Sequence, residues 1–290
     1  MDLLHGAIDL HIHTAPDIFP RCVTAVTAAQ AAKQAGMRAI VVKSHSTDTS
    51  ARAEMARDIA QFPVYGAVVL NYAVGGLNEY AVLEMARQGG RIVWMPTIGA
   101  RHFIQRAQSA PMLMRAIPSG VPGLVVSQNG VSLDPPVVRI LDLIAEHDLV
   151  LATGHLEPRE SRLLVEEAVA HGVKRIVVTH PHEAFVAMNV GDVRHLAGLG
   201  AFIEFTDNNP LEERIAMIRS VGVGQCFIST DGGTVDRPSP VVRLTSYLDA
   251  LLEAGFSVEE LRHMSVSVPA FLLGLDGLSE PPRLTSAAAT

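Results

Sequence analysis

The chain has 290 residues and a formal net charge of −7, with 48% hydrophobic and 18% charged residues. This composition supports a large buried core, and the acidic balance excludes a basic face for nucleic acid or anionic lipid, so a small-molecule partner is expected. Cys22 and Cys226 lie far apart without CxxC spacing, and the opening MDLLHGAIDL lacks the basic segment of a leader, so we expect a reduced, cytoplasmic protein. No apolar run approaches the ~20 residues of a membrane-spanning helix, so insertion into a membrane is not expected.

Eight short apolar runs alternate along the chain with longer segments of helical period. Strands are expected at residues 7–13, 39–43, 64–70, 91–95, 149–153, 175–179, 201–205 and 225–230. Helices are expected at 23–34, 49–61, 77–88, 137–147, 158–171, 192–199 and 211–221, several of them ending in glycine directly before the next strand. Eight strands with short connections favour a closed (β/α)8 barrel, the TIM barrel. An open, doubly wound sheet is disfavoured because no Gly-x-Gly-x-x-Gly follows the first strand and there is no Walker A sequence.

Residues 97–134, after the fourth strand, are too many for an ordinary connection and are rich in Pro, Gly and Ser. We expect an elaborated loop that shapes a substrate pocket, with a small hairpin at 124–133. Residues 1–275 are expected to form one barrel domain, and residues 276–290 a frayed tail without a periodic apolar face.

Metal-capable side chains follow the carboxyl ends of the predicted strands. Alternate residues of a strand share a face, so His11 and His13 converge if the first strand is extended. In a barrel all these ends open onto a single face, where active sites are built, so residues far apart in sequence meet there. The side chains at these ends are His11, His13, Lys43, His45, His155, His180, His182 and Asp231.

The order of these residues resembles the amidohydrolase superfamily of metal-dependent barrel hydrolases: His-x-His on the first strand, His after the fifth and sixth, and Asp after the eighth. The resemblance runs from Ile8 to a closing helix in SVPAFLLGL, near Leu275. It implies that His11, His13 and Asp231 hold one divalent metal, and that His155 and His180 serve a second metal or the substrate. One or two ions, most simply Zn²⁺, are expected.

The sequence departs from that pattern at the fourth strand, where many members carry a carboxylated lysine or a glutamate. Here the strand reads VWMPT, with neither, and Lys43 is the only lysine on the proposed face. A desolvated lysine beside metal charge is driven toward its neutral form, which reacts with carbon dioxide to give a bridging carbamate. The alternative is an ammonium that pairs with a carboxylate. Lys43 is therefore a candidate ligand, and the number of metal ions stays open.

Asp231 and His180 are the expected catalytic residues. A carboxylate can bind metal with one oxygen and accept a proton from water with the other. An N-cap role is the alternative for Asp231, because aspartate caps helices readily. Four further residues are expected to bind substrate, among them an arginine able to clamp a carboxylate or phosphate with two hydrogen bonds; they are Arg21, His45, Asn71 and His182.

These residues predict a metal-dependent hydrolase of a small polar substrate that cleaves an amide or other C–N bond, with an ester or lactone as a variant. A phosphoesterase and a single-metal decarboxylase are alternatives within the enzymes. A non-catalytic metal- or ligand-binding barrel is the alternative outside them. A homo-oligomer is left open.

Overall fold

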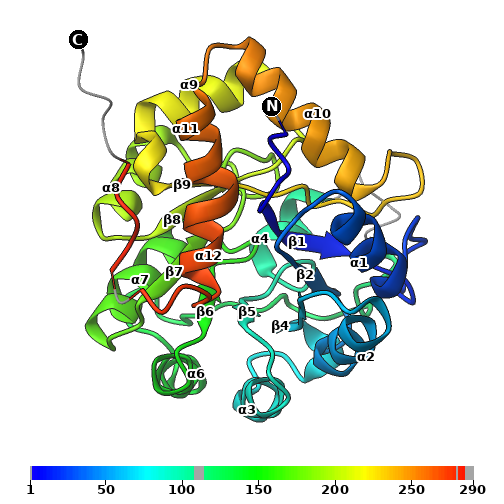
Figure 1. The fold of residues 1–290 in the computed structure, drawn as a ribbon. Helices are drawn as coiled ribbons and strands as arrows, with labels where there is room; N and C mark the ends of the chain where they lie inside the picture. The colour runs from blue at the N-terminus through cyan, green and yellow to red at the C-terminus, as the bar shows by residue number, and fades with distance from the viewer. Residues whose placement is uncertain (1, 108–113, 279, 285–290) are drawn as a thin grey trace.

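The computed structural model describes residues 2–107, 114–278 and 280–284. Its strands are all parallel and follow one another in sequence order, β1-β2-β3 and then β4-β5-β6-β7-β8-β9 (Figure 1). They are β1 Ile8–His13, β2 Ala39–Lys43, β3 Val64–Tyr65, β4 Ala67–Val69, β5 Ile92–Trp94, β6 Val150–Ala152, β7 Arg175–Val178, β8 Phe202–Phe205 and β9 Cys226–Ile228. The eight predicted runs are all present as strands, which confirms the parallel α/β class.

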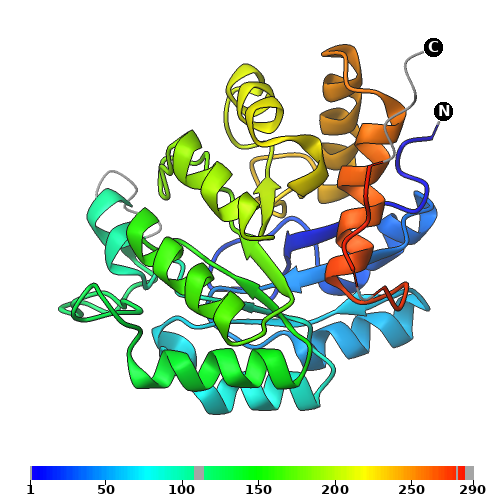
Figure 2. The ribbon, with the colours of Figure 1, turned by 90° about the vertical axis from the view of Figure 1, so that its left-hand side faces the viewer.

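Helices surround the strands, as the views along and across the molecule show (Figures 1 and 2). They are α1 Ala25–Gln34, α2 Ser50–Ala60, α3 Glu79–Arg87, α4 Arg101–Arg106, α6 Pro135–Glu146, α7 Pro158–Ala170, α8 Val190–Gly198, α9 Leu211–Val221, α10 Pro240–Glu253, α11 Val258–Arg262 and α12 Val268–Leu272. The seven predicted helices are found within a few residues of their expected ends. The helix expected near SVPAFLLGL is α12.

The third strand differs from its prediction. One run was expected at 64–70, but the chain breaks at Gly66 into β3 and β4. The hydroxyl of Thr49 causes this break, because it accepts a hydrogen bond from the Ala67 amide at 2.8 Å and donates to the Val42 carbonyl at 2.7 Å. A Cβ on Gly66 would lie 2.3 Å from the Ser50 Cα. The start of α2 is thus wedged into the sheet at a position that only glycine admits.

The last strand meets the first around Gly232. Ile12 and Gly232 form a parallel bridge, and the His13 amide donates to the Gly232 carbonyl at 2.8 Å. The Asp9 carboxylate adds a side-chain link, since it accepts from the Thr230 hydroxyl at 2.6 Å. These contacts bring the two ends of the strand series together.

Gly233 makes this junction testable. Its φ is +122°, and a Cβ there would lie 1.9 Å from the His13 carbonyl oxygen. We expect Gly233→Ala to lower the free energy of unfolding by about 2–4 kcal/mol, through backbone strain and displacement of β1. Urea denaturation followed by circular dichroism measures this, with Gly198→Ala as the control because nothing lies near the added methyl group there. Equal stability of the two variants would contradict the packing described.

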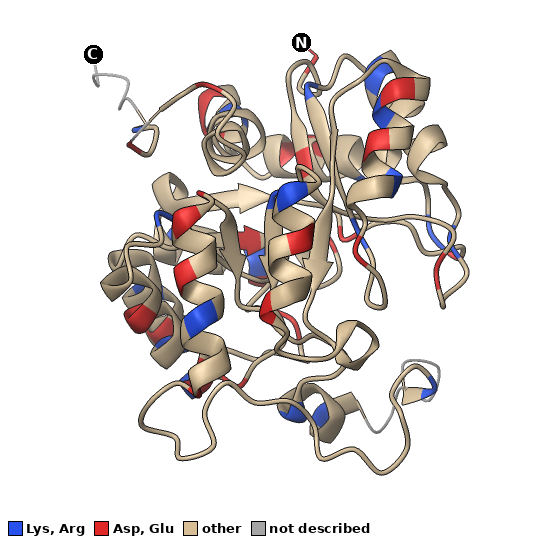
Figure 3. Cartoon of the chain, turned by 90° about the horizontal axis from the view of Figure 1, so that it is seen from below, with Lys and Arg blue, Asp and Glu red and all other residues tan. Residues whose placement is uncertain are grey.

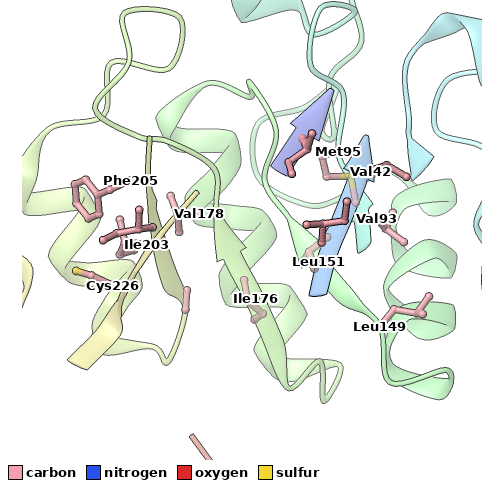
Figure 4. Packing of buried hydrophobic residues seen from close by; sticks show 14 of the residues in the cluster. Val42, Val93, Met95, Leu149, Leu151, Ile176, Val178, Ile203, Phe205 and Cys226 are labelled. Carbon is pink, nitrogen blue, oxygen red and sulfur yellow. The ribbon is translucent and has the colours of Figure 1, made fainter. Parts of the chain in front are cut away.

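The buried apolar side chains form two layers, one on each side of the strands. One lies inside the strands and includes Ile8, Leu10, Val41 and Trp94, packed against α12, which closes the amino end. The other lies between the strands and the outer helices; Figure 4 shows it, with Val42, Val93, Met95, Leu149, Leu151, Ile176, Val178, Ile203, Phe205 and Cys226 labelled. Because side chains alternate along a strand, every second residue faces the interior.

A bulge in β1 changes this alternation just before the histidines. The register with β2 shifts between Asp9 and Ile12. Ile8 and Leu10 belong to the inner layer, yet Ile12 belongs to the outer one. An inserted residue of this kind reverses the alternation, so His11 and His13 join the inward-facing set. The Asp9 carboxylate accepts from the His11 amide at 3.1 Å and supports the bulge.

The loop after β5 contains α4, and the hairpin expected at 124–133 is absent from the described part of this loop. Leu124 makes a single bridge to Ala100, and no strand follows it up to the start of α6. Side chains compete with a strand ladder here: Asn129 accepts from the amides of Val131 and Ser132, and Ser127 accepts from that of Gly130. The hairpin prediction was wrong for this reason.

The remaining expectations concern the surface and the tail. Among the described residues, no helix is long and apolar enough to cross a membrane. Figure 3 shows acidic and basic residues interspersed along the helices. The frayed tail predicted for 276–290 falls partly on positions 279 and 285–290, which lie outside the described residues; within the rest, Asp276 pairs with Arg38 at 2.7 Å.

Candidate metal centre and substrate cavity

The metal-capable side chains lie together at the carboxyl ends of the strands, beside a cavity of about 390 Å³. Side chains from β1, β2, β6, β7 and β9, or from the residues directly after them, reach this cavity. They include His13, Lys43, His45, His155, His180 and Asp231, together with Arg21 and Glu183. The juxtaposition predicted from the strand ends is therefore present in the fold.

Three ligand atoms meet at the β1–β9 junction. The Nε2 atoms of His11 and His13 lie 2.9 and 3.0 Å from the same oxygen of Asp231, Oδ1. Both imidazoles are buried, and the Asp231 side chain is 21% exposed. Burial would raise the pKa of Asp231, but the charge of His11 and the hydrogen bonds from His11 and His13 hold this pKa well below its usual range. Two imidazole nitrogens and a carboxylate oxygen suit Zn²⁺ and similar divalent ions.

Glu204 fixes the orientation of His11. Its Oε1 lies 2.9 Å from His11 Nδ1, which leaves Nε2 directed toward His13 and Asp231. Burial and the neighbouring Lys43 oppose a charge on His11, but the carboxylates of Asp231 and Glu204 prevail and raise its pKa from 6.5 to about 9. A carboxylate behind a metal-ligating histidine is a common outer partner that sets the tautomer and the basicity of the ring.

Lys43 lies between the histidine pair and the inner layer. Its Nζ is 2.8 Å from His11 Nε2 and 4.7 Å from the centre of the Trp94 ring. Burial lowers its pKa from 10.5 to about 8, although nearby carboxylates oppose this. A neutral fraction of the amine therefore exists near neutral pH, as carbamate formation requires.

Three imidazoles that line the cavity are neutral at pH 7, because burial disfavours their charged form. Burial lowers the pKa of His13, His45 and His155 well below 6.5. Nδ1 of His155 and Nδ1 of His180 are buried and have no hydrogen-bond partner among the described residues. The rings of His155 and His180 lie 5.0 Å apart. Imidazole nitrogens without a protein partner are available to a cation or a polar substrate.

A second potential ligand group consists of His180, Glu183 and Asp231, whose ligand atoms lie within 4.8 Å of one another. His180 and Asp231 have positive φ values of 23° and 47°. Positive φ values are uncommon outside glycine and accumulate at functional sites. With His155 next to it, this group supplies donors for a second cation, so the described residues accommodate one ion or two.

Asn208 joins the carboxylates of this group. Its Nδ2 donates to Glu183 Oε1 at 3.0 Å and to Asp231 Oδ2 at 3.2 Å. Its Oδ1 accepts from Arg237 and Arg243, each near 3 Å. The amide orientation is thereby determined, and Asp231 keeps Oδ1 for His11 and His13.

Of the four residues predicted to contact substrate, two line the cavity and two do not. Arg21 and His45 line the cavity. Asn71 does not line this cavity, because its side-chain amide hydrogen-bonds Thr97 and the His45 carbonyl. It lines a smaller neighbouring cavity instead. His182 also lies outside the lining; its ring stacks on Phe205 at 5.3 Å. These contacts hold the surrounding loops instead of presenting the two side chains to the 390 Å³ cavity.

Two acidic residues of the site were missed in the sequence. Glu204 is the only charge in the apolar strand AFIEF, and it has the same parity as Phe202, which faces inward. Glu183 ends the motif THPHE, three residues after His180. A lone carboxylate inside a buried strand was the available signal, because burying an unpaired charge is costly and demands a partner.

The contact between Glu204 and His11 predicts a measurable effect on metal affinity. We expect Glu204→Gln to weaken Zn²⁺ binding by about 10–100-fold. The neutral glutamine amide would hold the His11 ring less firmly than the carboxylate does, and it would make His11 Nε2 a weaker electron donor to the metal. Competition with a chromophoric chelator at pH 7 measures the dissociation constant. Glu84→Gln is the control, since Glu84 is an exposed partner of Arg87. Unchanged affinity in Glu204→Gln would remove this role.

Solved structures of three enzymes resemble this fold. An organophosphorus hydrolase from Deinococcus radiodurans aligns with a TM-score of 0.58 at 15% identity, covering 93% of this chain and 92% of that chain. A 2,6-dihydroxybenzoate decarboxylase from Rhizobium gives 0.56 at 11%, covering 94% and 100%. An amidohydrolase from Pseudomonas aeruginosa gives 0.61 at 11%, covering 94% and 97%. At these identities the likeness concerns the fold alone, and it confirms the TIM barrel predicted from the sequence.

Sequence comparison gives a family but no named activity. Among proteins of curated function, none matches the chain. The profile of DUF6282, described as a family of unknown function, matches residues 6–204, a span that includes His11, His180 and Glu204 and ends before Asp231. Because this match covers more than half of the 290 residues, the chain belongs to the family DUF6282.

Proposed function

We propose that this protein is a metal-dependent hydrolase that cleaves an amide or other C–N bond, or the related ester or lactone, of a small molecule. The observation that carries the proposal is the convergence of His11 Nε2, His13 Nε2 and Asp231 Oδ1 beside a 390 Å³ cavity. Nothing in a purely structural role requires two buried imidazoles on one carboxylate oxygen with a further pair of imidazoles facing them.

The donor set fits a divalent cation, and Zn²⁺ is the ion we propose. His11, His13 and Asp231 would hold the first ion. His155, His180 and Glu183, together with a modified Lys43, would hold a second ion or the substrate. When bound, such a cation supplies Lewis acidity, which polarises a substrate carbonyl and acidifies water.

The side chains of the chain itself provide the remaining chemistry. Asp231 stays ionised, and its Oδ2, held by Asn208, is oriented to accept a proton from an attacking water and to return it to the leaving group. His180 lines the same cavity and is placed to hydrogen-bond the substrate. Phe19, Phe103 and Phe185 also line this cavity, and displacement of water by apolar rings would strengthen these interactions.

Lys43 is proposed as a carbamate in the active protein. Its lowered pKa and the absence of an acid at the end of β5 both favour modification. We expect native mass spectrometry in bicarbonate buffer to detect about 44 Da of added mass, which Lys43→Arg should abolish. Exhaustive acid treatment before measurement should also remove it. Wild-type mass without this increment under all buffers would leave Lys43 as an amine.

The test of the function uses metal-stripped protein reconstituted with Zn²⁺, Mn²⁺ or Co²⁺. Initial rates are measured on panels of amides, esters and lactones, phosphoesters and carboxylic acids. The proposal expects hydrolysis of an amide, ester or lactone that disappears with chelator and returns with metal. Turnover only of phosphoesters would favour the phosphoesterase. Metal binding without any turnover would favour a non-catalytic ligand-binding barrel.

A decarboxylase is the second candidate, and one observation favours it. The fourth barrel strand, β5, ends on Trp94, whose ring lies beside Lys43 where a metal-ligating acid would otherwise stand. The remaining donors suffice for a single ion, the arrangement that the sequence resemblance associates with decarboxylating relatives. Release of carbon dioxide from the carboxylic acid panel, without hydrolysis elsewhere, would select this candidate.

We also propose that the protein works in the reducing cytoplasm as a small-molecule enzyme. Both cysteines are free, Cys22 exposed and Cys226 buried. An exposed free thiol is stable against oxidation only where thiols are kept reduced.

A further inference from the structure

Apolar side chains form much of the cavity lining, beside the imidazoles. Phe19, Ile98, Phe103, Phe185 and Val235 all line it. The rings of Phe103 and Phe185 have centroids 5.0 Å apart, and Phe103 also stacks on His155 at 5.0 Å. A small polar substrate, as the sequence analysis predicts, would gain nothing from such a wall. Burial of apolar substrate surface against it contributes roughly 25 cal/mol per Å², so an apolar substrate body fits better.

A guanidinium lies beside these apolar side chains. Arg21 lines the cavity, its side chain is 5% exposed, and its Nε donates to Asp17 Oδ2 at 2.8 Å. Asp17 therefore occupies the Nε side of the guanidinium, and the two Nη groups have no partner among the described residues. The Arg21 carbon Cζ also lies 5.5 Å from the centre of the Phe19 ring. A held guanidinium with a free pair of N–H donors matches the two oxygens of a carboxylate.

The loop that carries Arg21 is fixed in place. Arg21 forms an antiparallel bridge with Thr234, and the Cys22 amide donates to the Gly233 carbonyl at 2.9 Å. The loops after β1 and after β9 are thus paired over the cavity. Because Asp231 precedes the second loop directly, the guanidinium stands at a fixed separation from the candidate metal ligands, as recognition of one substrate size requires.

We propose that the substrate is a small monocarboxylic acid with a flat, aromatic body. Its carboxylate binds the Nη groups of Arg21, and its ring lies between Phe19 and the pair Phe103 and Phe185. The bond to be cleaved then faces His13, His180 and Asp231. This inference rests on the proposed function for the cleavage step, but the binding step stands apart from it. A phosphate group in place of the carboxylate is less suitable, because Arg21 already pairs with Asp17 and the two Nη groups match two oxygens of a singly charged group.

Binding of 3-phenylpropanoate to the Zn²⁺-loaded protein, measured by calorimetry, tests the proposal without turnover. We expect 3-phenylpropanamide, propanoate and 2-phenylethylphosphonate each to bind more weakly than this acid. Arg21→Gln should weaken binding of the acid by about 10–100-fold and leave the amide unaffected. Arg162→Gln is the control, because Arg162 is exposed and pairs with Glu166.

Several results would overturn the proposal. These are equal affinity for the acid and its amide, full affinity in Arg21→Gln, or tighter binding of the phosphonate or of propanoate. If Arg21→Gln does not fold, Arg21→Lys replaces it and should weaken binding of the acid by losing the paired donors; the comparison of ligands on the wild type needs no variant. Arg21-dependent binding of the acid in a protein that hydrolyses nothing would refute the proposed function alone.

Discussion

Asp231→Asn is expected to lower kcat/KM by about 10²–10⁴-fold on whichever amide or ester the protein hydrolyses. The asparagine keeps an oxygen that can face His11 and His13, but its second position carries N–H groups, which cannot accept a proton from water. The NH₂ group would also lie against the Asn208 donor, where the carboxylate accepts at 3.2 Å. Because one ligand oxygen remains, zinc content at saturating Zn²⁺ should stay near that of the wild type.

The two readouts separate proton transfer from metal binding. Zinc content is measured by inductively coupled plasma mass spectrometry, and rates are measured on the same samples. Asp276→Asn is the control, because Asp276 lies at the surface and pairs with Arg38. Full activity in Asp231→Asn would remove the proton-transfer role. Loss of zinc in parallel with activity would instead assign Asp231 to metal binding alone.

The location of the site was predictable because a parallel barrel imposes it. Once the apolar runs are recognised as strands, the residue that follows each one must lie at the carboxyl edge. His155 and Asp231, 76 positions apart, needed no further information to be placed beside one another. Periodicity alone predicts this level of detail, since it reports which face of each element is buried.

The inward direction of His11 and His13 required more than periodicity. Strict alternation from Ile8 and Leu10 would turn both histidines outward; the bulge between Asp9 and Ile12 brings them inside. A bulge depends on contacts with a strand more than two hundred residues away, here the hydrogen bonds between Asp9 and Thr230. Strand geometry predicted that His11 and His13 share a face, but the sequence pattern carries no direct signal for the contact that turns this face inward.

The same limit explains the hairpin and the missed acids. At 124–133 the turn residues were recognised, but their side chains satisfy the backbone that a second strand would have paired. Glu204 was passed over because its partner, His11, lies on a different strand, and only the closed arrangement brings them to 2.9 Å. Sequence reasoning thus finds residues at strand ends more readily than residues that act from within the barrel.

His11→Ala is expected to remove bound metal and activity together. The imidazole contacts Glu204, Lys43 and Asp231 at once, at 2.8–2.9 Å. Without it the Zn²⁺ dissociation constant should rise at least ~100-fold, the upper end of what loss of an outer partner costs. The buried Glu204 carboxylate also loses its donor, which should destabilise the metal-free fold by about 1–3 kcal/mol.

His171→Ala provides the matched control, since His171 pairs with Asp142 near the surface. Chelator competition gives the zinc affinity, and urea denaturation of metal-free protein gives the stability. A purely structural histidine would lower the unfolding free energy while zinc affinity stayed at the wild-type value. The metal centre instead requires that zinc affinity fall in His11→Ala by far more than the change in stability can explain, because Nε2 of this ring would hold the ion together with Nε2 of His13 and Oδ1 of Asp231.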